Sequence, residues 1–305
     1  MATREILRCV LTATIAALSG SVTHAAEVTI PWKQNFTYTT DEVFDSKKPD
    51  TAGRTGRTFR FMNGAPEEGK KVEKAGNLRG DYIHPDGITG PVPVVILMHG
   101  CTGWTKPVLD WAKEKGKKLL DEGVGVLILD SFGPRQVKRT CGAPNYHWGW
   151  RRVEDAYSAL AWLIESDRAI PDRVFVMGRS NGGTTAIMLA TRMAASGHRD
   201  HKFAGSFAIS PACNEMEKFD FAVPVTIFTG DEDMANNPKL CAAIDGKNGL
   251  IKTVIFKGVH HGFEDRTPTY VENGWRMEHN PKADKETMDQ ILTIIKSSDT
   301  KNAAK

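Results

Sequence analysis

A serine between glycines is the first residue of this chain whose setting suggests chemistry. It lies in the sequence G-R-S-N-G at 178–182, after an apolar stretch at 174–177 and before a run of small residues. A sharp turn between a buried strand and a helix of this kind holds the serine hydroxyl out at the carboxyl edge of a sheet. The sequence therefore predicts Ser180 as a nucleophile; the alternative is a glycine-rich turn whose serine has no chemical role.

A serine hydroxyl is a poor nucleophile near neutral pH, so it needs a base within hydrogen-bond reach and an acid that orients the base. Candidates for both follow later apolar stretches. The sequence G-D-E-D at 230–233 follows the stretch 223–229, and G-V-H-H-G-F at 258–263 follows the stretch 251–257. Each cluster therefore leaves a predicted strand at the same carboxyl edge as Ser180.

Within each cluster one residue is favoured. We expect Asp233 rather than Asp231 to be the acid, because it lies further beyond the final glycine of its strand, where the loop curls toward the base. We expect His261 rather than His260 to be the base, because the glycine that follows lets its ring swing over the sheet edge. Taken singly, an acid after a strand is usually a cap and a histidine is usually structural. Three residues in the order Ser, Asp, His are a stronger signal than any one.

Attack by a serine on a carbonyl creates a negative oxygen that needs backbone N–H donors. One donor usually comes from the residue after the nucleophile, which here is Asn181, and the other from the loop after an early strand. That loop is H-G-C-T-G-W at 99–104, and the amide of Cys101 is its expected donor. Cys101 is also a candidate half-cystine, and the two roles are compatible because only its backbone would bind the oxygen.

The elements that would position these residues alternate between strand and helix from residue 92 onward. Apolar stretches typical of buried parallel strands lie at 92–98, 125–129, 173–177, 204–209, 223–229 and 251–257. Helical patterns lie at 107–120, 153–165, 181–194, 238–244 and 282–296. This alternation predicts the α/β class, with a mainly parallel central sheet flanked by helices in three layers. Short strands at 58–62 and 78–83 are expected at its edge.

The first residues differ from the rest of the chain. Arg4 and Arg8 begin the segment, an apolar or small run covers 9–22, and small residues end it at Ala25 and Ala26. This is the pattern of a cleaved signal peptide, and a helix of the mature fold is the alternative. We therefore expect residues 1–26 to be a signal peptide, with the cut after Ala25 or after Ala26, and the protein to be periplasmic or secreted.

The remaining residues, 27–305, are expected to form a single α/β domain, in which 27–80 supplies edge strands and an extension. No later stretch approaches the length of a membrane span, so we expect no membrane contact after cleavage. Lys and Arg total 40 against 37 Asp and Glu, and aromatic residues make up 8%. That balance disfavours a nucleic-acid partner and leaves a small molecule as the expected one.

Export changes how the cysteines are interpreted, because disulfides persist outside the cytoplasm. Four cysteines remain after the signal sequence: Cys101, Cys141, Cys213 and Cys241. Three pairings are possible, and we favour 101 with 141 and 213 with 241. Their spacing forms no C-x-x-C or H-x-x-x-H cluster, so we expect neither a metal site nor a cofactor.

Substrate-binding residues are sought in the stretch 132–152, which connects a strand to a helix and carries arginines and aromatic residues. An arginine with aromatic neighbours suits an anionic or aromatic acyl group. The candidates are Arg135, Trp148 and Trp150. The alternative is that these arginines are solvated, or paired with Asp130 and Glu154.

Five short motifs together resemble the α/β-hydrolase superfamily and, within it, the dienelactone hydrolase family. They are H-G at 99–100, D-S-F-G-P-R at 130–135, the serine turn at 178–182, G-x-x-D at 230–233 and H-G-F at 261–263. The resemblance spans residues 80–297 and implies a cofactor-free hydrolase of ester or lactone bonds. Dienelactone hydrolases proper have cysteine at the nucleophile position, where this chain has Ser180.

These observations predict a serine esterase that works through an acyl-enzyme. Two other functions stay open. A peptidase of the prolyl-oligopeptidase kind shares the order of catalytic residues, although no propeller domain precedes the serine turn. A binding protein that kept the fold and lost activity is the third reading, and the full set of catalytic candidates argues against it.

Overall fold

The computed structural model describes residues 25–32, 77–141, 148–198, 200–272 and 274–302, with the side chains of 148–150 and 299–302 excepted. The predicted strand at 58–62 and nearly all of the predicted signal peptide lie outside these residues. Among the described residues, no helix combines the length and the apolar composition that crossing a membrane requires.

An eight-stranded sheet forms the centre of the molecule, in the order β1-β2-β4-β3-β5-β6-β7-β8. Pairing is parallel from β4 to β8, whereas β1 and β2 are antiparallel edge strands. The strands are β1 Ala26–Ile30, β2 Leu78–Ile83, β3 Val92–Met98, β4 Gly125–Asp130, β5 Ala169–Arg179, β6 Gly205–Ile209, β7 Val225–Gly230 and β8 Ile251–Phe256. The predicted α/β class and the mainly parallel sheet are confirmed.

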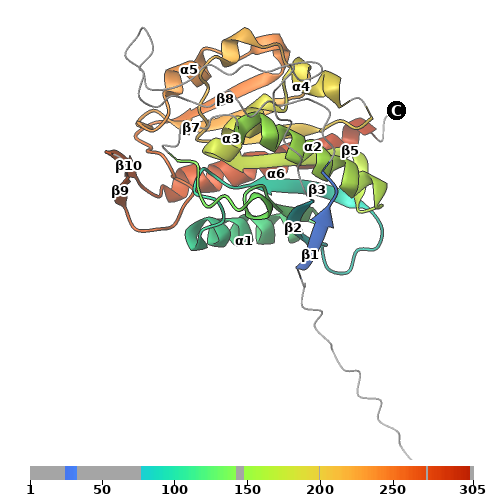
Figure 1. Cartoon of the computed structure of the whole chain (residues 1–305). Helices are drawn as coiled ribbons and strands as arrows, with labels where there is room; N and C mark the ends of the chain where they lie inside the picture. Colours follow the sequence, from blue (N-terminus) through green and yellow to red (C-terminus); the bar gives the residue numbers. More distant parts are fainter. Residues whose placement is uncertain (1–24, 33–76, 142–147, 199, 273, 303–305) are drawn as a thin grey trace, which may run out of the picture.

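Helices cover both faces of the sheet (Figure 1). They are α1 Lys106–Leu120, α2 Trp148–Glu165, α3 Asn181–Met188, α4 Arg192–Gly197, α5 Pro238–Ala242 and α6 Pro281–Asn302, with 3₁₀ turns at Gly133–Arg135, Met216–Lys218 and Lys247–Gly249. The apolar side chains of β3 divide between two cores: Ile96 packs with residues of α2 and α3, and Leu97 with residues of α1 and α6. A strand buried on both faces explains the continuous apolar run at this position.

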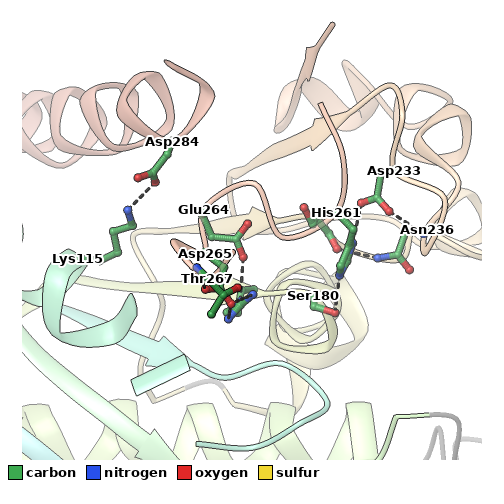
Figure 2. Close-up of polar contacts among 11 residues, drawn as sticks. Lys115, Ser180, Asp233, Asn236, His261, Glu264, Asp265, Thr267 and Asp284 are labelled. Carbon is green, nitrogen blue, oxygen red and sulfur yellow. Dashed lines mark hydrogen bonds and ion pairs between the residues drawn. The ribbon is translucent and has the colours of Figure 1, made fainter. Parts of the chain in front are cut away.

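A buried ion pair joins the two helices on one face. Lys115 of α1 lies with its Nζ 2.5 Å from Oδ1 of Asp284, near the start of α6 (Figure 2). The two side chains are 1% and 4% exposed. Since breaking such a pair would leave one charge buried alone, it fixes the position of α6 against α1.

Several elements differ in extent from the sequence prediction. The helix expected at 181–194 breaks, because the carbonyl of Ala190 accepts bonds from the amides of Ala222 and Val223 at 2.9 and 3.2 Å. Thr191 then caps α4, its Oγ1 accepting from the amide of Ala194. The helix expected from 153 begins at Trp148, and β5 is longer at both ends than the predicted strand.

A small hairpin was not predicted at all. Strands β9 Tyr270–Glu272 and β10 Trp275–Met277 form a two-stranded antiparallel sheet between β8 and α6. Met277 also forms an isolated bridge with His261. The hairpin therefore packs against the segment that carries the predicted base.

Candidate active site

Ser180 occupies a strained turn between β5 and α3. Its backbone has φ 51° and ψ −119°, a conformation that residues with a side chain seldom adopt and that costs about 1–3 kcal/mol. The Ser180 amide donates to the carbonyl of Ile209 at 2.8 Å, and its own carbonyl accepts from the amide of Thr184 at 2.9 Å. These two bonds hold the turn between the neighbouring strand and the first turn of α3.

Two glycines of the turn are required by close backbone packing. A Cβ atom on Gly178 would lie 2.1 Å from the carbonyl oxygen of Gly182. A Cβ atom on Gly182 would lie 2.4 Å from the carbonyl oxygen of Met98, at the end of β3. Both distances are below any real contact of a Cβ atom, so the turn presses α3 against β3 in a way that only glycine permits.

The three predicted catalytic side chains lie together. His261 has its Nε2 3.1 Å from Oγ of Ser180 and its Nδ1 2.8 Å from Oδ2 of Asp233 (Figure 2). With Nδ1 protonated against the carboxylate, Nε2 is left as the acceptor for the serine proton. Asp233 and His261 are 3% and 5% exposed, so water competes little for these contacts. The arrangement has the geometry of a nucleophile, a base and an orienting acid.

Asn236 holds Asp233 in place from the same loop. The amide of Asn236 donates to Oδ1 of Asp233 at 2.9 Å, and the side-chain Nδ2 donates to the carbonyl of Ser210 at 2.7 Å (Figure 2). Asp233 therefore has one oxygen for His261 and the other fixed by the backbone. The link to Ser210 ties the loop to the end of β6.

The neighbouring Asp and His have other partners. Oδ1 of Asp231 accepts from the amide of Gly258 at 2.6 Å, which closes the turn after β8. Nδ1 of His260 lies 3.2 Å from the carbonyl oxygen of Glu232, and its Nε2 lies 3.7 Å from Glu278. Asp231 and His260 therefore connect loops, whereas Asp233 and His261 make the contacts that reach Ser180.

The predicted oxyanion donors lie on the segments that flank Ser180. A Cβ atom on Gly100 would lie 3.4 Å from Cβ of Ser180, so the loop after β3 passes directly beside the serine. Asn181 is the first residue of α3, where no intrahelical acceptor is available. Within the described part of the chain, neither the amide of Cys101 nor that of Asn181 donates to another residue.

Arg179, directly before the serine, binds two carboxylates of the loop that carries His261. Its Nε lies 2.8 Å from Oε1 of Glu264, and its Nη1 and Nη2 lie 3.3 Å from Oδ2 of Asp265. Burial alone would lower the pKa of Arg179, but Glu264 and Asp265 outweigh it and raise the pKa above its ordinary value. No sequence pattern predicted this contact, because the partners are more than eighty residues apart.

Of the three predicted substrate-binding residues, only Arg135 has a side chain that the structure describes. Arg135 lies with its Nη2 2.7 Å from Oδ1 and its Nη1 2.9 Å from Oδ2 of Asp155, and its side chain is 9% exposed. Its guanidinium also lies over the ring of Trp32. Arg135 therefore pairs with Asp155, a partner that the sequence analysis did not name, and its role in substrate binding stays a prediction. The side chains of Trp148 and Trp150 lie outside the described residues.

Two disulfides are present. They join Cys101 to Cys141 and Cys213 to Cys241, which is the pairing favoured from the sequence. The first anchors the segment before residue 142 to the loop beside Ser180, and the amide of Thr140 also donates to the carbonyl of Cys101 at 2.7 Å. Among the described residues, no three His, Cys, Asp or Glu side chains gather as metal ligands would.

Comparison with solved structures supports the fold. A dienelactone hydrolase-like promiscuous phosphotriesterase from metagenomic libraries superposes with a TM-score of 0.54 at 16% identity, covering 72% of this chain and 92% of the other. A thermophilic esterase from the planctomycete Thermogutta terrifontis superposes with a TM-score of 0.52 at 15% identity, covering 72% of this chain and 89% of the other. At these identities the likeness shows the fold alone.

The family assignment rests on sequence. No curated protein matches the chain. The model of the dienelactone hydrolase family matches residues 78–298, which include all three residues of the Ser180, Asp233 and His261 cluster. The chain therefore belongs to the dienelactone hydrolase family and is a carboxylic ester hydrolase of the α/β-hydrolase fold.

Proposed function

We propose that this protein is an exported serine hydrolase that cleaves carboxylic esters or lactones of small molecules through an acyl-enzyme. The observation that carries the proposal is the chain of two hydrogen bonds from Ser180 to His261 and from His261 to Asp233, at 3.1 and 2.8 Å. A serine bonded to a base that is itself oriented by a carboxylate is the arrangement needed to attack a carbonyl.

In the first half of the reaction, Oγ of Ser180 forms a bond to the ester carbonyl carbon while its proton passes to Nε2 of His261. Asp233 stabilises the imidazolium that results, without taking the proton. The tetrahedral intermediate collapses when the bond to the leaving alkoxide breaks, and His261 returns the proton to that oxygen. A lactone follows the same steps, except that its leaving oxygen stays attached to the acyl group.

In the second half, water attacks the acyl-enzyme. His261 accepts a proton from the water and then donates it to Oγ of Ser180, which leaves with the electron pair of the broken acyl bond. In both halves the amides of Cys101 and Asn181 would bind the negative oxygen, because they flank Ser180 and have no other acceptor among the described residues. No cofactor takes part in this sequence of steps.

The test is covalent labelling by a fluorophosphonate, read as intact mass. One label per folded chain is expected for the wild-type protein, and none for Ser180→Ala. Ser166→Ala is a matched control, because Oγ of Ser166 donates to the carbonyl of Trp162 near the end of α2. If the wild-type protein is not labelled, or if Ser180→Ala is labelled equally, the proposal is wrong.

Export and the extent of the mature domain belong to the same proposal. Residues 1–26 act as a signal peptide, and residues 27–305 form the mature domain, periplasmic or secreted. The two disulfides support this, because such bonds persist outside the cytoplasm. Cleavage after Ala26 gives this mature domain, whereas cleavage after Ala25, the other candidate site, would also keep Ala26, the first residue of β1, which pairs with Tyr82. Amino-terminal sequencing of the protein from a periplasmic extract tests this; an uncleaved start at Met1 contradicts it.

A further inference from the structure

Arg152 is a buried cation beside the proposed active site that the triad does not use. It lies near the start of α2 and its side chain is fully buried. Its Nη1 lies 2.6 Å from Oδ1 of Asn181, and its Nη2 lies 2.6 Å from the carbonyl oxygen of His99. One guanidinium thus bonds to both segments that flank Ser180.

These two segments carry the proposed oxyanion donors. Asn181 supplies one amide itself, and Cys101, two residues after His99, supplies the other. The segments come from different strands, the loop after β3 and the turn after β5, and are remote in sequence. A planar, rigid guanidinium with a bond to each sets the distance between them more narrowly than a flexible group would.

Direct ion pairing does not explain the charge of Arg152. Both hydrogen bonds that it makes with described residues go to neutral oxygens. Asp155 and Asp130 favour its charge through space, but the carboxylate of Asp155 is bonded to Arg135. A buried cation without a bonded carboxylate is costly, and an apolar side chain of similar volume would usually fold as well or better. The ring of Phe132, 5.4 Å from the guanidinium carbon, offsets part of this cost. Burial lowers the pKa of Arg152 to about 10, so the group remains charged near neutral pH.

We propose that Arg152 is a positioning residue of the oxyanion hole: it holds the loop of His99 and the side chain of Asn181 at a fixed separation and places a positive charge behind the two amides. The inference rests on the proposed function. The carbonyl oxygen is neutral in the bound ester and becomes negative only in the tetrahedral intermediate. Arg152 therefore stabilises the transition state more than the bound substrate, and it acts on kcat rather than on KM.

The test compares Arg152→Met, Arg152→Lys and a control. Methionine keeps the apolar length without donors or charge, and we expect kcat to fall by about 10- to 100-fold with KM changed less than about 2-fold. Lysine keeps the charge and can donate to both oxygens, so it should recover part of the loss. Arg168→Met is the control, because Arg168 lies over Trp162, beyond the far end of α2, and should leave kcat and KM unchanged.

Two further measurements distinguish a role of Arg152 in the oxyanion hole from a purely structural role. Fluorophosphonate titration gives the fraction of active chains, so that kcat is expressed per working site. An alkylboronic acid, which forms a tetrahedral adduct on a catalytic serine, should lose affinity for Arg152→Met by the same factor as kcat. If Arg152→Met leaves kcat per active site and boronate affinity unchanged, the inference about Arg152 is wrong. The proposed function is judged separately, by fluorophosphonate labelling of the wild-type protein.

If Arg152→Met does not fold, Asn181→Ala replaces it. Asn181 is partly exposed, and alanine removes only the side chain that Arg152 holds, while the backbone donor remains. We expect kcat per active site and boronate affinity to fall together at constant KM. Full activity in this variant contradicts the proposed link.

Discussion

Arg179 and Glu264 form a buried ion pair, with Nε of the arginine 2.8 Å from Oε1 of the carboxylate, that joins the residue before Ser180 to the third residue after His261. The serine and the histidine are therefore connected twice, once by their own hydrogen bond and once through these neighbours. The second connection does not depend on the protonation of His261. It can keep the histidine in place while protons move through the site.

Arg179→Met is expected to destabilise the fold by about 3–5 kcal/mol, because it leaves Glu264 and Asp265 buried beside each other without a cation. Arg266→Met serves as the comparison: its partner is Glu114, its side chain is 62% exposed, and its loss should cost less than about 1 kcal/mol. Urea denaturation of both variants measures the difference. Equal losses would show that the Arg179 pair contributes no more than a surface contact.

The two aspartates after β7 should differ sharply in their effect on catalysis. Asp233→Asn keeps the shape of the side chain but removes the charge that orients and stabilises His261, and we expect kcat to fall by about 10⁴-fold. Asp231→Asn should change kcat by less than about 3-fold, since Asp231 binds only the Gly258 amide. Steady-state hydrolysis of a p-nitrophenyl ester compares them. Equal effects would mean that the acid has been assigned to the wrong residue.

Loss of either disulfide should lower stability, but only loss of the one at Cys101 should also lower activity. Their partners are 40 and 28 residues apart, so loss of either is expected to cost about 3–4 kcal/mol in the loop-entropy account. Cys141→Ser should also lower kcat, because it frees the loop of Cys101 beside Ser180. Cys213→Ser with Cys241→Ser should leave kcat per active site unchanged. Urea denaturation and ester hydrolysis measure the two effects; equal kcat in both variants would contradict the special position of Cys101.

The sheet edge and the closeness of Ser180, Asp233 and His261 could be predicted because they depend on local patterns and one general rule. Parallel strands end at the same edge, so the residues after β5, β7 and β8 meet there; Gly230 at the end of β7 pairs with Phe256 at the end of β8. Glycines mark the sharp turns at 178–182 in the sequence. Position in the chain was therefore enough to bring Ser180, Asp233 and His261 together.

The supporting contacts could not be predicted, because they join residues far apart in sequence with no periodic pattern. The hairpin β9–β10 has strands of three residues each, too short for a recognisable alternation. Its second strand is held by an isolated bridge between Met277 and His261, which are sixteen residues apart. The paired state of Arg135 likewise depends on where α2 places Asp155. The hairpin and the Arg135 pair can be identified only once the tertiary structure is known.

His99 makes the stability of the fold depend on pH. It is fully buried, its Nδ1 donates to the carbonyl of Gly100 at 2.7 Å, and its ring lies near Phe132. Burial, and then the charge of Arg152, lower its pKa well below the ordinary value of 6.5. The unfolded chain therefore takes up a proton near pH 6.5 while the folded chain does not. Stability from this group is complete above pH 6.5 and is lost as the pH falls below it.

The loss should be about 1.4 kcal/mol for each pH unit below 6.5, until the folded state is also protonated. His99→Gln removes this dependence while keeping a donor for the carbonyl of Gly100. The free energy of unfolding, measured by urea denaturation between pH 7.5 and 5.5, should fall more steeply for the wild-type protein than for the variant, by about 1 kcal/mol over the lowest pH unit. Every other titrating group is common to both proteins, so the difference in slope isolates His99. Parallel curves would show that His99 titrates alike in the folded and unfolded chains, so that neither burial nor the charge of Arg152 lowers its pKa.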